Sequence, residues 1–246
     1  MRLLEIVDRS KDEYSPIRLL GTHVSTPEEV IKLIEGHCST VLAAYRQAGG
    51  VLYRGVSDVR DNDSPVITAK IRQDRRPVHK DRQAHELLHQ AFIELGLKAT
   101  RKNSIFCTAQ DALAHDWGEA YIVFPKDGWT ATVYSAGLKT YGFYRQLQYV
   151  RAAESTFEIN QWKKKNPKLT QEPDMTVVGE LAKILKREDA PKSISTAEGL
   201  AEIIKAGWAD VLITGDSYVA VAVPELQIKK NRQFTNAVLE GLKLKW

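Results

Sequence analysis

The chain has 246 residues, of which 43% are apolar and 27% charged, with two cysteines far apart in the sequence. This composition excludes a collagen, a disulfide-rich miniprotein and a disordered tail, and no apolar run reaches the ~18–20 residues of a membrane helix. The formal net charge of +4 permits a phosphate-bearing ligand but does not indicate a protein that coats nucleic acid. The first residues lack the pattern of a signal peptide, so we expect a cytoplasmic protein that does not contact a membrane.

A helix is predicted over residues 26–48. Thr26 and Glu29 match a capping box, apolar residues then recur at helical spacing, and two glycines end the pattern. We expect residues 1–50 to form an N-terminal helical segment that packs on the rest of the fold.

Short strands are predicted along the rest of the chain. They fall at residues 51–55, 104–108, 119–125, 129–135, 210–213 and 218–223, and residues 66–71 are a further candidate. The turn-forming residues between the third and fourth strands, and between the fifth and sixth, predict that each of these pairs lies side by side as a hairpin. Helices come first and the last strands are antiparallel, which favours an α+β fold over a regular βαβ series.

Further helices are predicted at residues 81–95, 177–186 and 196–205, and residues 226–246 are expected to form a C-terminal helical tail. Two charged stretches interrupt these elements, one at residues 72–82 and one in an exposed insertion near residues 160–175. Such stretches are usually solvated, and they are also able to contact an acidic partner. The chain contains neither of the usual glycine-rich loops that hold nucleotide phosphates.

Residues 85–89 match the pattern His-Glu-x-x-His. On a helix this spacing places His85 and His89 on one face, where they are able to bind zinc while Glu86 activates a metal-bound water. A zinc-dependent hydrolase is therefore one alternative function. A zinc site needs at least three protein ligands, and no downstream residue completes a recognised motif. We therefore favour an ordinary amphipathic helix and expect no stable metal.

Three separated segments, taken together and in this order, resemble the ADP-ribosyltransferase superfamily. The first reads Val-Leu-Tyr-Arg-Gly at residues 51–55, the second reads Asn-Ser-Ile-Phe-Cys-Thr-Ala at residues 103–109 and continues to Trp117, and the third reads Ala-Asp-Val-Leu-Ile at residues 209–213. The resemblance covers roughly residues 45–225. The layout is also similar to that of uncharacterised proteins of tailed bacteriophages.

The resemblance implies a split antiparallel β core with flanking helices, formed by residues 51–225. It implies NAD as the substrate, with Arg54, Gly55 and Trp117 in NAD binding and with Thr108 and Asp210 in catalysis. The implied reaction is transfer of ADP-ribose from NAD to a macromolecule. The acceptor would be a host protein or a nucleic acid in the cytoplasm of a phage-infected bacterium.

These residue types suit the implied chemistry. Cleavage of the nicotinamide–ribose bond passes through an oxocarbenium-like state that a carboxylate stabilises. A guanidinium binds phosphate or ribose oxygens through two hydrogen bonds, and an aromatic ring stacks on nicotinamide. Asp210 is one methylene shorter than the glutamate usual in the superfamily, so a second alternative is a catalytically inactive protein that binds a host factor or a nucleotide. Glu202 and Glu119 are alternative carboxylates, although neither has the strand context.

Overall fold

A computed structural model describes most of the predicted core. It covers residues 26–56, 65–74, 82–133, 178–179, 182–183, 185–186, 191–208, 210–223 and 229–244. The predictions for residues 1–25, for residues 75–81 of the first charged stretch and for the insertion near residues 160–175 lie outside the described residues. Of the helix predicted at residues 177–186, the structure describes residues 178–179, 182–183 and 185–186, and these are helical.

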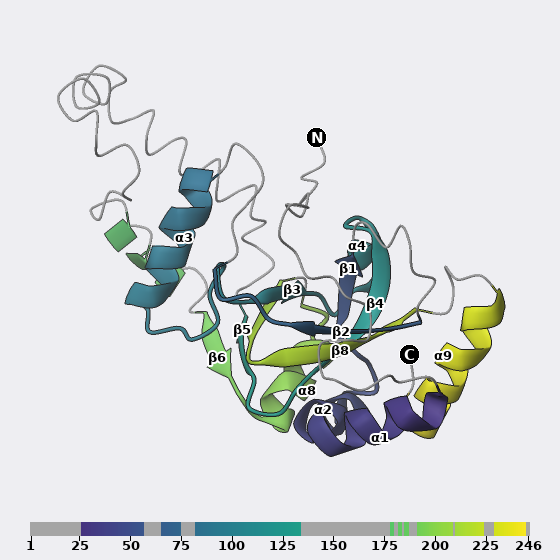
Figure 1. The fold of residues 1–246 in the computed structure, drawn as a ribbon. Coiled ribbons are helices and arrows are strands. Elements are labelled where there is room, and N and C mark those ends of the chain that lie inside the picture. Colours follow the sequence, from purple (N-terminus) through teal and green to yellow (C-terminus); the bar gives the residue numbers. More distant parts are fainter. Residues whose placement is uncertain are drawn as a thin grey trace.

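Two four-stranded sheets form the centre of the molecule (Figure 1). The first sheet has the strand order β1-β4-β8-β2, and the second has the order β3-β7-β5-β6. The strands are β1 (Tyr53–Val56), β2 (Val66–Lys70), β3 (Ile105–Cys107), β4 (Glu119–Pro125), β5 (Thr130–Val133), β6 (Lys192–Ile194), β7 (Val211–Thr214) and β8 (Ser217–Ala222). Every pairing between these strands is antiparallel, which confirms the α+β class.

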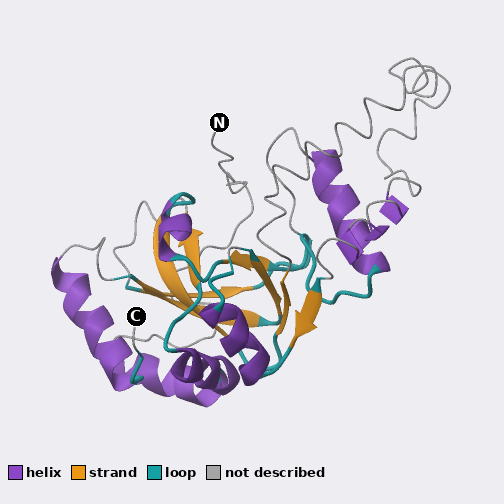
Figure 2. Ribbon diagram, turned by 180° about the vertical axis from the view of Figure 1, so that it is seen from behind, coloured by secondary structure: helices purple, strands orange, loops and turns teal. Residues whose placement is uncertain are grey.

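Helices cover the sheets unevenly. They are α1 (Pro27–His37), α2 (Ser39–Ala48), α3 (Arg82–Glu94), α4 (Asp111–His115), α8 (Ala197–Lys205) and α9 (Lys229–Gly241). Figure 2 shows α1, α2, α8 and α9 as an arc along one side of the sheets, while α3 stands at the opposite end. Within the described part of the chain, no helix is long and apolar enough to cross a membrane.

The single helix predicted over residues 26–48 is wrong, because the chain breaks at Cys38 between α1 and α2. The capping box at the start is confirmed: the Thr26 hydroxyl accepts from the Glu29 N–H at 3.3 Å, and the Glu29 carboxylate accepts from the Thr26 N–H at 3.2 Å. The break is stabilised from far along the chain. Asp127, after β4, accepts hydrogen bonds from the backbone N–H groups of Ser39 at 3.0 Å and Thr40 at 2.8 Å, and so satisfies the start of α2.

Both predicted hairpins are also wrong. β4 pairs with β8 in the first sheet, and β5 pairs with β7 in the second, so neither short turn reverses the chain within one sheet. Instead, β4 and β8 run antiparallel in the first sheet, and short segments at residues 126–129 and 215–216 connect them to β5 and β7, which run antiparallel in the second sheet. Between the pairs Pro125–Tyr218 and Thr130–Thr214 there are four residues on one strand and three on the other. One extra residue of this kind bends a strand.

Two apolar clusters lie on either side of the second sheet. The larger one fills the space between the sheets and the arc of helices, and it contains Tyr45 of α2, whose ring packs edge-on against Phe124 with centroids 5.5 Å apart. The smaller one joins α3 to the opposite side of β3 and β7, where Phe106 and Leu212 lie. Side chains alternate along a strand, so the odd- and even-numbered residues of β3 face different clusters.

Candidate functional site

Strands from both sheets meet at Thr108, directly after β3. The Thr108 N–H donates to the Tyr53 carbonyl at 2.9 Å, and the Thr108 carbonyl accepts from the Tyr53 N–H at 2.7 Å. Since β1 and β3 are edge strands of different sheets, this bridge joins the two sheets. Arg54 follows Tyr53 and therefore lies one residue from the junction.

Asp210 approaches the same junction from another strand. It directly precedes β7, in which Val211 pairs with the residue before Thr108. The residue after Thr108, Ala109, donates its N–H to the Trp208 carbonyl at 2.8 Å. Thr108 and Asp210 lie between these two links, so their backbones run side by side. The structure thus brings the backbones around Arg54, Thr108 and Asp210 together, although they are distant in the sequence.

The three side chains have different immediate neighbours. The Arg54 guanidinium lies 6.0 Å from the ring centroid of Tyr218 on β8, which is the outer limit of a cation–π contact. The Thr108 hydroxyl accepts from the Gln110 N–H at 3.0 Å and so shapes the turn that leads into α4. Asp210 lies within the electrostatic influence of Arg101, which stands in the turn before β3.

Gly55 and Trp117 are in direct contact through the packing of α4 on β1. A Cβ on Gly55 would lie 2.2 Å from the Ala114 carbonyl oxygen and 2.7 Å from the Trp117 Cβ. Only a residue without a side chain allows the end of α4 to approach the strand this closely. The glycine therefore allows the Cβ of Trp117, whose side chain is half-buried, to lie beside the residue that follows Arg54.

The Asp210 carboxyl is electrostatically unusual. Burial disfavours its charged form and raises its pKa above the ordinary value, while the positive charge of Arg101 acts in the opposite direction. A carboxyl that is desolvated and balanced by a specific charge is typical of functional sites, although ion pairs that serve structure alone also show it.

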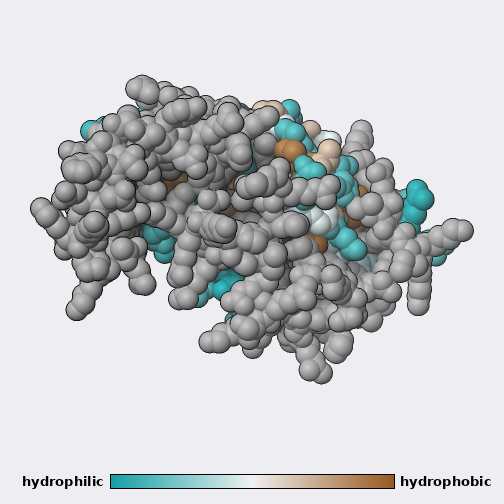
Figure 3. Space-filling view, turned by 90° about the horizontal axis from the view of Figure 1, so that it is seen from above, coloured by the Kyte–Doolittle hydropathy of each residue, from teal (hydrophilic) through white to brown (hydrophobic). Residues whose placement is uncertain are grey.

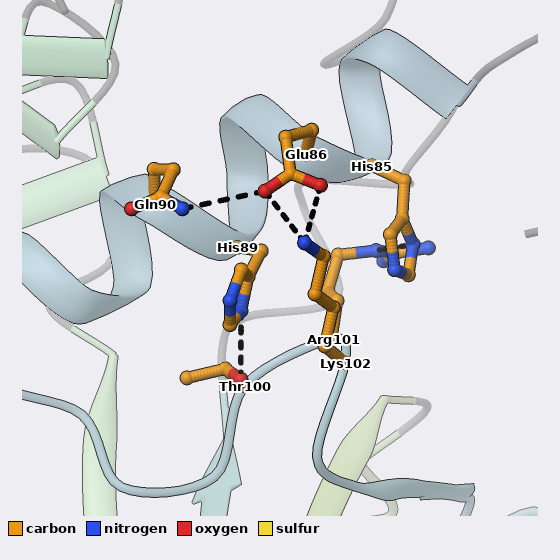
Figure 4. A network of polar contacts seen from close by, with 7 residues as sticks. All are labelled: His85, Glu86, His89, Gln90, Thr100, Arg101 and Lys102. Atoms are coloured by element: carbon orange, nitrogen blue, oxygen red, sulfur yellow. Dashed lines mark hydrogen bonds and ion pairs between the residues drawn. The ribbon is translucent and has the colours of Figure 1, made fainter. Parts of the chain in front are cut away.

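The residues of the His-Glu-x-x-His pattern make protein contacts with one turn (Figure 4). The Thr100 hydroxyl lies 2.9 Å from His89 Nδ1, the Arg101 Nε donates to His85 Nδ1 at 3.3 Å, and the Lys102 ammonium contacts both Glu86 oxygens at 2.6 and 2.7 Å. Three residues of α3 thus bind three consecutive residues of the turn. Among the described residues, no group of three His, Cys, Asp or Glu side chains is arranged to hold a metal.

The charges of this network are fixed by its contacts. Burial alone would raise the pKa of Glu86, but the hydrogen bonds from Lys102 and Gln90 and the charge of Lys102 hold it below its usual value. Burial and the neighbouring Lys102 lower the pKa of His89, so its imidazole is neutral at pH 7.

Sequence reasoning missed Arg101 and Tyr218 as members of the site. Each depends on a contact with a residue distant in the chain, and neither belongs to a recognisable sequence motif. On the face seen in Figure 3, hydrophilic and hydrophobic residues of the described part of the chain lie next to one another. No family model, curated protein or solved structure matches the chain.

Proposed function

We propose that the protein transfers ADP-ribose from NAD to a macromolecule and that its two sheets form the split β core of an ADP-ribosyltransferase. The observation that carries this proposal is the junction at Thr108. It links the strand of Arg54 to the strand that Asp210 precedes, and these are the segments in which the superfamily has its NAD-binding arginine and its catalytic carboxylate. An acceptor in the cytoplasm of a phage-infected bacterium is part of the same proposal.

Each residue near the junction has a role that its chemistry supports. Arg54 binds phosphate or ribose oxygens of NAD, because a guanidinium forms paired, charge-assisted hydrogen bonds with such oxygens. Trp117 offers an aromatic face for nicotinamide, and Gly55 allows it to stand beside the strand. Thr108 holds the turn into α4 and, through its backbone, the neighbouring strands.

Asp210 stabilises the positive charge that develops on the ribose as the nicotinamide bond breaks. For this role the carboxylate must be ionised. Burial alone works against ionisation, and the charge of Arg101 works in its favour. A desolvated carboxylate that is kept ionised interacts more strongly with a cationic transition state than an exposed one, because water screens it less.

The same observations allow a second function, in which the protein binds a nucleotide or a host factor without catalysis. The shorter side chain of Asp210 and its burial favour this alternative, since burial disfavours the charged form that catalysis requires.

Transfer of a radioactive label separates the two functions. Purified protein is incubated with bacterial lysate and NAD that carries ³²P in its adenylate phosphate, and the macromolecules are then separated and counted. The transferase places covalent label on an acceptor, and Asp210→Asn removes that label. A binding protein retains NAD on a filter but labels nothing. If the wild-type protein neither labels an acceptor nor retains NAD, the transferase function and NAD binding are both wrong.

A further inference from the structure

Contacts from α3 position one buried side chain beside the candidate site. His89 contacts Thr100, His85 accepts from Arg101, and Glu86 binds Lys102, and Figure 4 shows these side chains directed from the helix toward the turn. The turn leads directly into β3. The His-Glu-x-x-His motif, which resembles a zinc site in the sequence, thus holds the turn at residues 100–102, and this turn precedes β3.

Arg101 is the buried member of this turn. Its exposed fraction is 7%, and that of His85 is 4%. The guanidinium lies 4.8 Å from the ring centroid of Phe106, and its Nε donates to His85 Nδ1. The ring supports the guanidinium from its face and the imidazole holds it from one edge, so together they fix its plane. A buried arginine is rare unless its charge has partners.

Asp210 lies on the same side of the second sheet. Phe106 pairs with Leu212 across β3 and β7, and both contribute to the small cluster under α3. Asp210 directly precedes β7 and stands two residues before Leu212, so we infer from the alternation of side chains along a strand that it faces this side. The electrostatic effect of Arg101 on Asp210 agrees with that placement.

We propose that Arg101 is a positioning residue whose buried guanidinium, held in its plane by His85, supplies the positive charge that the Asp210 carboxylate faces. As a statement about catalysis, this inference rests on the proposed transferase function. As a statement about Asp210 in the free protein, it does not. The two parts therefore have separate tests.

The first test measures the titration of Asp210 without NAD. The full chain carries ¹³C in its aspartate carboxyl groups, and the Asp210 signal is assigned by its loss in Asp210→Asn. Arg101→Gln removes the charge, and we expect the midpoint of Asp210 to rise. Arg101→Lys restores a charge without the planar fork, and the midpoint returns toward that of the wild type. Lys102→Gln is the matched control, because Lys102 is the neighbouring cation and contacts Glu86 rather than Asp210. In Lys102→Gln, we expect the titration midpoint of Asp210 to stay at the wild-type value.

An unchanged Asp210 midpoint in folded Arg101→Gln overturns the inference, as does an equal rise in Lys102→Gln. If Arg101→Gln does not fold, the reciprocal variant decides. Asp210→Asn leaves Arg101 in place, and the ¹⁵Nε signal of Arg101 then shifts if the two groups interact. An unchanged signal overturns the inference.

The second test measures NAD cleavage. We expect Arg101→Gln to lower kcat roughly tenfold or more, which is less than the ~10²–10³-fold loss expected for removal of the carboxylate itself. KM remains close to the wild-type value, and Arg101→Lys recovers part of the rate. If the carboxyl titration changes as expected but the wild-type protein does not cleave NAD, the inference about Asp210 stands and the proposed function fails.

Discussion

Tyr53 and Thr108 exchange two backbone hydrogen bonds, of 2.7 and 2.9 Å, and this pair joins the edge of one sheet to the edge of the other. A second connection is formed by the short segments that lead from β4 to β5 and from β7 to β8. With both connections in place, the position of Arg54 relative to Asp210 is set by backbone hydrogen bonds rather than by flexible loops. Sites supported by strands hold their side chains more precisely than sites on loops.

The first prediction separates substrate binding from chemistry. Asp210→Asn keeps the size of the side chain but loses its charge, so we expect it to bind NAD like the wild type and to lose ~10²–10³-fold in kcat. Arg54→Ala removes contacts made before the reaction, so we expect weaker NAD binding, measured by calorimetry, with a smaller effect on kcat.

Glu119→Gln is the control for these variants. Glu119 is an exposed carboxylate on β4, paired with Val56 beside the site strand. If Asp210→Asn is fully active while Glu119→Gln or Glu202→Gln is inactive, the catalytic carboxylate has been assigned to the wrong residue.

The second prediction concerns the packing of α4 on β1. Gly55→Ala places a Cβ 2.2 Å from the backbone oxygen of Ala114, which cannot move without shifting the helix. Overpacking of this kind costs ~1–3 kcal/mol of unfolding free energy, measurable by urea denaturation. Gly36→Ala in α1 is the matched control. Its Cβ meets nothing within 4 Å, so alanine there should stabilise the protein by about 0.5–1 kcal/mol. Equal stability of the two variants would contradict the close approach.

The third prediction is that replacement of Asp210, the proposed catalytic group, increases the unfolding free energy of the protein. Burial raises the pKa of Asp210 in the folded protein, despite the opposing charge of Arg101. The folded state therefore binds a proton more tightly than the unfolded state, and this contribution to stability is lost as the pH rises above the ordinary aspartate value of ~3.9. At pH 7 the wild type carries the cost of an ionised, partly buried carboxylate, and Asp210→Asn does not.

We therefore expect Asp210→Asn to have the larger unfolding free energy at pH 7, by urea denaturation, and the difference to shrink as the pH falls toward 4. A variant less stable than the wild type at pH 7 would show that the charged form of Asp210 is favoured by the fold.

The fourth prediction concerns the cap supplied by Asp127. Its carboxylate accepts from the Ser39 and Thr40 N–H groups and from the Ser39 hydroxyl at 2.7 Å. These hydrogen bonds outweigh partial burial and lower the pKa of Asp127. Its contribution is therefore present at neutral pH and lost as the pH falls through the depressed folded value.

Asp127→Ala should lower the unfolding free energy at pH 7 by about 1 kcal/mol, because α2 loses its cap. Asp127→Asn retains an acceptor oxygen and should lose less. If alanine and asparagine have the same effect, or if neither has one, the carboxylate does not cap α2 in solution.

The sequence predicts individual elements well where the signal is local. The capping box at Thr26 and the strand around Tyr121 follow from a few neighbouring residues, and the α+β class follows from their order. The break at Cys38 depends on Asp127, which is distant in the chain. The two supposed hairpins fail for a related reason: short polar turns look alike whether the chain reverses or bends into another sheet, and only the pairing partners distinguish them.

The residues of the candidate site also differ in whether the sequence predicts them. The residues around Arg54, Thr108 and Asp210 stand in short segments that a reader of the sequence is able to compare with known proteins. Arg101 does not, because its place is set by His85 on α3 and by the ring of Phe106 on β3. The His-Glu-x-x-His pattern is read differently in the structure, since each of its polar residues binds a residue of the turn at 100–102.

The most direct test of the account is the release of nicotinamide from NAD by the purified protein. Nicotinamide is quantified by chromatography over time for the wild type and for Asp210→Asn at equal concentration, with and without bacterial lysate as a source of acceptor. The account predicts steady release by the wild type, stimulated by the lysate, and release lowered ~10²–10³-fold in the variant. Equal release by both proteins, or none by the wild type under either condition, would contradict it.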